Sequence, residues 1–240
     1  MTDEKTGCLI CGGELVYSDT EKEMECSFCG KKFRTNVACE NGHFICDECH
    51  GREAEGIITA FCLNTDLKDP IKIAITLMRH PSMHMHGPEH HYLVPAVLIT
   101  AYYNEINEPE KKEKALKKAL SRSEHIKGGF CGTHGTCGAA IGTGIFISVI
   151  TGSTPLSGES WSLSNRMTAT ALMAIADAGG PRCCKRDTYL AIIGAVKFLE
   201  ENFKVALPVT KEFCCEFSGL NRECRKKECP FWCGQSDNLK

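Results

Sequence analysis

The sequence predicts a mainly α-helical protein in which a zinc-ribbon-like module precedes the helical domain and a cysteine-rich segment follows it. Three observations lead to this expectation: paired cysteines in the first 60 residues, apolar residues at helical spacing in the middle, and five cysteines crowded near the end. The 240 residues are 42% hydrophobic and 24% charged, which is typical of a globular chain and excludes a disordered one. We expect a metal module at 1–60, a helical domain with the candidate active site at 61–210, and a metal-binding tail at 211–240.

Charge and cysteine content narrow the classes of function. The 28 basic residues nearly balance 30 acidic ones, and the first 60 residues carry 12 acidic against 6 basic side chains, so nucleic acid is an unfavourable partner. No apolar run reaches the length of about 20 residues that a membrane helix needs, and no secretory signal opens the chain. An odd total of 17 cysteines favours metal and thiol chemistry in the cytoplasm over a secreted disulfide framework.

The strongest motif is a pair of Cys-x-x-Cys turns, Cys8 with Cys11 and Cys26 with Cys29, each followed by glycine. Such a turn points both sulfur atoms at one ion, and two turns on a hairpin supply four thiolates in a tetrahedral array. Zinc suits this set, although a rubredoxin-like iron site would use the same ligands. We expect these four residues to bind one ion together.

A second set of four donors follows directly, with Cys39, His43, Cys46 and Cys49 spaced as Cys-x3-His-x2-Cys-x2-Cys. Three thiolates and one imidazole also satisfy a tetrahedral ion. In the alternative interpretation Cys39 is a small core residue and only the last two cysteines are functional. Because the module is acidic and poor in apolar residues, we expect a scaffold or docking element rather than a reader of nucleic acid.

Capping signals define the first helices of the middle region. Asp69 followed by Pro70 predicts a helix start, and Pro81 ends that helix. The next helix is expected to bury one apolar face, with Pro95 tolerated only in its first turn. Its apolar face would consist of Leu93, Val94, Val97, Leu98, Ala101 and Tyr102.

The later helices differ in character. Glycines at 138 and 142 let another backbone approach closely, and Asp187 is expected to cap the last helix. We expect a charged helix with a solvated face at 110–123 and apolar helices at about 137–151, 161–178 and 187–204.

Five of the nine histidines fall within twelve residues, in a loop that proline and glycine keep from being helical. Imidazole is the commonest transition-metal ligand, so the cluster indicates a metal or proton-transfer site, whereas any single histidine would be an ordinary surface or core residue. A turn at Gly87-Pro88 would fold the preferred ligands toward one another. These are His86, His90 and His91.

A glycine-rich loop carries Cys131, His134 and Cys137 into an apolar helix. The positive end of the helix dipole is expected to lower the pKa of the Cys137 thiol. Cys183 and Cys184 stand at the entrance of another helix, and we expect all four cysteines to meet at one redox or metal centre. Two alternatives remain for Cys183 and Cys184. They could form a vicinal disulfide, or one of them could bind a metal while the other packs in the core.

These cysteines carry a resemblance to a known family. Cys131-Gly132, then the run Cys137-Gly138-Ala139-Ala140-Ile141-Gly142, and later Cys183-Cys184 resemble the redox-active proteins named after a C-GCAxxG-C-C pattern, over roughly residues 128–200. Glycine and cysteine are exchanged around position 137. The whole chain also resembles an uncharacterised family of cysteine-rich proteins from anaerobes, some joined to methyltransferase-like modules. The resemblance implies redox-active cysteines or a metal cluster at these four positions.

A polar segment at 152–161 supplies two further candidates for the active site. Glu159 would handle a proton and Arg166 would bind an anion if this segment closed over a pocket. In the alternative, Ser160 or Ser162 caps the following helix and Glu159 favours its N-terminus.

The tail holds cysteines whose spacing does not form paired zinc turns. An iron–sulfur cluster and an irregular zinc site both accept four thiolates from such loops. The candidate ligands are Cys214, Cys215, Cys224, Cys229 and Cys233.

Three functions fit these features. The favoured one is a cytoplasmic metal-binding redox-active protein whose cysteine/histidine centre performs electron, sulfur or methyl-group chemistry, with zinc and an iron–sulfur cluster as cofactors. The second is a non-catalytic adaptor whose zinc sites hold surfaces for a methyltransferase or redox partner. The third is a zinc hydrolase or lyase in which the histidine loop holds the ion that activates water.

Overall fold

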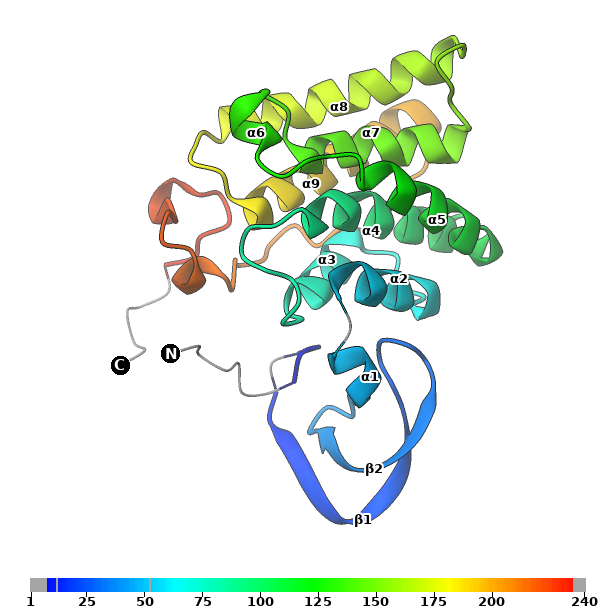
Figure 1. The fold of residues 1–240 in the computed structure, drawn as a ribbon, viewed down its shortest axis with the longest axis vertical. Coiled ribbons are helices and arrows are strands. Elements are labelled where there is room, and N and C mark those ends of the chain that lie inside the picture. Colours follow the sequence, from blue (N-terminus) through cyan, green and yellow to red (C-terminus); the bar gives the residue numbers. More distant parts are fainter. Residues whose placement is uncertain (1–7, 12, 52, 235–240) are drawn as a thin grey trace.

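A cysteine-rich β-hairpin stands at one end of a helical body in the computed structural model, which describes residues 8–11, 13–51 and 53–234 (Figure 1). The prediction of a mainly helical protein is confirmed. The elements are β1 (Leu15–Glu25), β2 (Lys32–Cys39), α1 (Asp47–His50), α2 (Ala54–Asn64), α3 (Pro70–Met78), α4 (Glu89–Glu105), α5 (Lys112–Ser123), α6 (Phe130–Thr133), α7 (Gly138–Thr151), α8 (Glu159–Asp177) and α9 (Cys184–Phe203), with 3-10 turns at Pro109–Lys111, Ser218–Leu220 and Lys226–Glu228. Helix α2 runs across the domain boundary expected at residue 60.

The two strands pair antiparallel and form a strongly curved hairpin (Figure 1). Leu15 lies opposite Cys39 at one end and Glu25 opposite Lys32 at the other, with a shift of register between Tyr17 and Lys22. This pairing places the start of β1 beside the end of β2, while the turn between the strands lies at the far end of the ladder.

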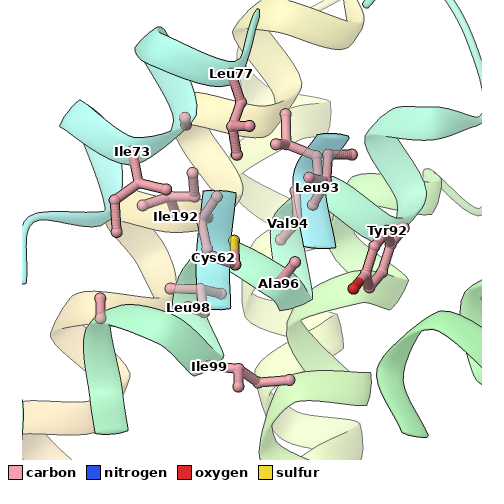
Figure 2. Close-up of a cluster of buried hydrophobic side chains, with 14 of the residues drawn as sticks. Cys62, Ile73, Leu77, Tyr92, Leu93, Val94, Ala96, Leu98, Ile99 and Ile192 are labelled. Carbon is pink, nitrogen blue, oxygen red and sulfur yellow. The ribbon is translucent and has the colours of Figure 1, made fainter. Parts of the chain in front are cut away.

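Helix α4 forms the centre of the body and packs against α2, α3, α5, α7 and α9. Its 17 residues are buried on almost every side, so the expectation of a single apolar face was wrong. Figure 2 shows part of this core, where Ile73, Leu98 and Ile192 come from three different helices.

Pro95 lies in the second turn of α4 rather than the first, because the helix starts at Glu89. Proline cannot donate to the carbonyl four residues earlier, which belongs to His91. The Ser123 hydroxyl donates to that carbonyl oxygen at 3.4 Å and partly replaces the missing bond. Helix α9 likewise starts earlier than expected, at Cys184, so Asp187 sits in its first turn and is not its cap.

Other local signals are confirmed. The Asp69 carboxylate accepts hydrogen bonds from the backbone N–H groups of Ile71 and Lys72 and caps α3, as its place before Pro70 predicted.

Among the described residues, no helix combines the length and apolarity required to cross a lipid bilayer.

The hairpin module packs against the helical body through one aromatic residue. Phe28 is fully buried, 5.3 Å from the Phe61 ring and 5.5 Å from the His80 ring, measured between centroids. His80 donates from Nε2 to the Cys49 carbonyl oxygen at 2.9 Å. Module and body therefore share a continuous apolar core.

Arg79 links three parts of the chain. Its guanidinium donates to the Ile10 carbonyl in the module and pairs with Glu216 in the tail, at 2.8 Å from Nε to Oε2. The tail itself returns along the body, where Asp69 Oδ2 accepts from the Thr210 N–H at 2.8 Å, and ends beside the start of α9 (Figure 1).

Close packing of α7 on α4 depends on glycine, as expected from the spacing of 138 and 142. A Cβ added at Gly142 would stand 2.8 Å from Pro95 Cδ and 3.1 Å from the His91 carbonyl oxygen. We expect Gly142→Ala to destabilise the protein by about 1–3 kcal/mol, because overpacking shifts α4 away. The measurement is the free energy of unfolding in urea.

Gly194→Ala in α9 is the matched control. The nearest atom to its added Cβ is Met167 Cε at 3.9 Å, so the better helix propensity of alanine should leave stability unchanged or raise it by up to about 1 kcal/mol. Equal effects of the two substitutions would contradict the close approach at Gly142.

Candidate metal and thiol centres

The first group of metal donors lies where the start of β1 meets the end of β2. It consists of Cys8, Cys11, Cys39 and His43, whose donor atoms all lie within 4.8 Å of one another. Cys11 Sγ is 3.4 Å from Cys39 Sγ, and Cys8 Sγ is 3.7 Å from His43 Nδ1. A metal ion that binds thiolates in a tetrahedron at about 2.3 Å requires sulfur atoms about 3.8 Å apart, so this set can hold one metal ion.

The second group lies at the turn of the hairpin and at helix α1. Cys26, Cys29, Cys46 and Cys49 also bring their sulfur atoms within 4.8 Å of one another, with 3.8 Å between Cys29 and Cys46. The Cys46 N–H donates to Cys26 Sγ at 3.4 Å, the kind of backbone contact that supports a thiolate ligand. This set can hold one metal ion through four thiolates.

The eight predicted donors therefore divide differently from their order in the sequence. The expected sites joined the pair Cys8/Cys11 to Cys26/Cys29, and that grouping was wrong. The pair before β1 meets Cys39, the last residue of β2, and His43 just after it. The pair at the turn meets Cys46 and Cys49, which follow further along the chain. The antiparallel hairpin causes this, because it keeps its turn away from the start of its first strand. Cys39 is a member of a donor group as well as a buried residue.

The thiols of the first group have opposed pKa shifts. Burial raises the pKa of Cys8 to about 11, whereas the Gly13 N–H lowers the pKa of Cys11 to about 6. Full deprotonation of such a group requires a compensating positive charge, which a bound metal ion supplies.

Three cysteines from separate segments share one pocket in the helical body, here called the thiol pocket. Cys131 lies in α6, Cys137 is the N-cap of α7, and Cys184 is the first residue of α9. His90, His91 and Asp187 line the same pocket.

His90 carries a buried ring nitrogen that has no partner among the described residues. Its side chain is 1% exposed, and its Nδ1 lies 3.3 Å from the Gly87 carbonyl oxygen, which can only accept, so Nδ1 carries the proton. Nε2 is buried with no hydrogen-bond partner among the described residues, and its lone pair is free. Burial, and next the charge of Lys185, holds the pKa of His90 well below its usual range. Metal-bound histidines commonly make this bond to a carbonyl.

The other two preferred histidines have different places. His91 also lines the thiol pocket, donates from Nδ1 to the Ile126 carbonyl oxygen at 3.1 Å and packs against Gly138. His86 instead faces the tail, with Nε2 3.3 Å from Asn221 Oδ1. The histidine loop therefore does not gather its three candidates around one ion.

The expectation of a lowered pKa at Cys137 was wrong. Burial, reinforced by the Asp187 carboxylate 4.0 Å from the sulfur, raises the pKa of Cys137 to about 12. The Asp187 carboxyl pairs with Arg186 at 3.0 Å, and burial raises its own pKa. The dipole at the start of α7 does not outweigh this desolvation, so the metal-free thiol is no activated nucleophile at neutral pH.

Cys183 is not in the thiol pocket, contrary to expectation. It faces a second pocket, the tail pocket, with Cys215, Cys224 and Cys229. Cys214 and Cys233 form a disulfide, so neither is available as the metal ligand that the spacing predicted.

Three other predicted residues lie outside both pockets. His134 is exposed and hydrogen-bonds Thr133 at 2.7 Å. Glu159 and Arg166 are exposed near the start of α8. Neither residue lines the thiol pocket or the cleft beside it, and the nearest cleft residue of α8, Ala169, lies about 15 Å along the helix from Glu159 at 1.5 Å per residue.

Sequence reasoning missed a cleft of about 760 Å³ into which the thiol pocket opens. Cys131 and Cys137 line it on one side, and Leu172, Met173 and Ile175 of α8 line the other. Arg182 borders both the cleft and the thiol pocket. The sequence predicted a helix over about 161–178, and no pattern in it marks this helix, α8, as a wall of the cleft.

Fold and sites define a helical, cysteine-rich protein with donor groups able to hold metal ions. The chain belongs to DUF5714, a family of unknown function whose profile matches residues 58–232. The match includes the thiol and tail pockets and leaves out the module at 8–49. No curated protein and no solved structure matches the chain.

Double substitutions test the grouping of the module donors. Cys8→Ala with Cys39→Ala removes two ligands of one site and should cost one zinc ion per chain, whereas Cys8→Ala with Cys26→Ala damages both sites and should cost two. Elemental analysis of the purified full-length chain measures this loss. The reverse order of losses would support the grouping by sequence order.

Proposed function

We propose that the protein is a cytoplasmic metal-binding, redox-active protein whose working centre is the thiol pocket. Cys131, Cys137, Cys184 and the Nε2 atom of His90 would hold a cluster. A cluster suits them better than a single ion, because their donor atoms do not all lie within 4.8 Å of one another as those of the module groups do. When bound, such a centre supplies electron, sulfur or methyl-group chemistry. The convergence of three cysteines with an unpartnered buried imidazole nitrogen is the observation that carries the proposal.

The surroundings of the pocket fit a centre that acts on a bound molecule. The cleft joins thiols on one wall to an apolar wall of α8 on the other, a combination typical of small-molecule sites. Arg182 is placed to bind an anionic group at the mouth of the pocket. Asp187, buried beside Cys137, is placed to receive the proton that the thiol loses on ligation.

The hairpin module would then be structural. Zinc at its two donor groups compensates for a small apolar core, and Phe28 docks the module on the body. A redox or methyltransferase protein is the partner we propose for this part of the chain.

One observation favours the adaptor as a second candidate function. Leu15, Val16 and Tyr17 at the start of β1 are exposed by 44%, 53% and 73%. Apolar side chains on a strand of a two-stranded sheet are suited to binding another protein. In this alternative the thiol pocket has no chemical role.

Single substitutions in anaerobically purified protein distinguish the two functions. We expect Cys137→Ala and His90→Ala to weaken metal binding in the thiol pocket by about tenfold or more, because each removes a ligand. Cys62→Ala and His134→Ala are the controls, since Cys62 lies in the core and His134 at the surface. The measurements are metal content per chain and reductive titration.

Unchanged metal content and titration in Cys137→Ala and His90→Ala would refute the redox centre. The adaptor function would be supported instead if Tyr17→Ala lost binding to the partner protein while Cys137→Ala and His90→Ala still bound it.

A further inference from the structure

The tail is held firmly against the start of α9. The rings of Phe213 and Phe231 stack with centroids 5.1 Å apart, and both pack edge-on against Tyr189 at 4.8 and 5.2 Å. The disulfide between Cys214 and Cys233 joins the two ends of this segment. Figure 1 shows it as the orange-to-red chain beside the first turn of α9.

Four thiols line the tail pocket that this contact creates. One stands directly before α9 and three come from the tail, so chain segments about thirty to forty-five residues apart meet here. They are Cys183, Cys215, Cys224 and Cys229. Burial, and after it the neighbouring Cys183, Cys229 and Cys224, raises the pKa of the Cys215 thiol to about 11.

Backbone N–H donors lie beside three of these sulfur atoms. N–H groups of Arg186 and Phe217 are directed at Cys183 and Cys215, and the Lys226 N–H donates to Cys224 Sγ at 3.5 Å. Arg186 lines the pocket, and the buried Lys185 ammonium lies 4.7 Å from the centre of the Phe217 ring on its wall. The backbone donors favour the negative charge that four thiolates would bring, while the charge of Arg186 is shared with its ion-pair partner Asp187.

The spacing of the sulfur atoms distinguishes this pocket from the zinc-type groups. In the described part of the chain, the groups whose donors all lie within 4.8 Å are the two in the hairpin module. The tail thiols stand further apart around a pocket covered by Met85, Phe217, Phe231 and Trp232. In an iron–sulfur cluster, different iron atoms take different thiolates, so the ligands need not crowd one ion.

We propose that Cys183, Cys215, Cys224 and Cys229 bind an iron–sulfur cluster in the tail pocket. The site differs from the thiol pocket in all four ligands, although Cys184 of the thiol pocket is the next residue after Cys183. It requires no metal in the thiol pocket and stands independently of the proposed function.

The test uses the full-length chain purified without oxygen, with iron and acid-labile sulfide measured together. The Cys137→Ala background removes the contribution of the thiol pocket. In that background we expect iron and sulfide to remain, and a further Cys183→Ala or Cys224→Ala to lower both by about tenfold or more. Cys62→Ala, a change in the core away from the tail, is the control and should keep the cluster.

Zinc content of the module and far-ultraviolet circular dichroism report whether each variant folds. Cys224 lies in the tail outside any long helix, so Cys224→Ala remains informative if Cys183→Ala fails to fold. Absence of iron and sulfide in the Cys137→Ala background, zinc in their place, or full retention in Cys224→Ala would overturn the proposal. Any of these results would refute the cluster in the tail pocket without testing the metal centre proposed for the thiol pocket. That centre is tested by the Cys137→Ala substitution alone, through the metal that this variant loses relative to the wild type.

Discussion

Two adjacent cysteines at the start of α9 cannot point the same way, and the separation of the body's thiols into two pockets follows from this constraint. Cys183 is the extended N-cap and Cys184 the first helical residue, and consecutive residues of a helix are rotated by about 100°. Cys184 therefore faces α6 and α7, while Cys183 faces the tail. One helix start thus contributes to two separate groups of thiols.

In the hairpin module, strand pairing decides which metal donors come together. Spacing predicted all eight donors, because a Cys-x-x-Cys turn is a local feature. It did not predict which turns face one another, since that depends on strand pairing: Leu15 opposite Cys39 joins the first donors to the third pair and leaves Cys26 and Cys29 for the last. Pairing of Cys8 with His43 therefore followed only from the three-dimensional arrangement.

Local signals likewise predicted the helices but not the environment of their ends. Asp69 and Pro70 predicted the start of α3, and the glycines of α7 predicted a close approach by another backbone, which the structure shows to be that of α4. The pKa of Cys137 depends on burial and on Asp187, fifty residues further along the chain, so its direction of shift could not be predicted from local sequence. The place of Glu159 outside the cleft likewise depends on which residues of α8 face the thiols, and no local signal reports this.

The division of Cys183 and Cys184 between two centres can be tested by anomalous X-ray scattering from crystals of anaerobically purified protein. Data on both sides of the iron and zinc absorption edges locate each metal. The account predicts zinc at the two module groups, iron among the sulfur atoms of Cys183, Cys215, Cys224 and Cys229, and a separate metal peak beside Cys184. A single peak bonded to both adjacent cysteines, or a disulfide joining them, would contradict it.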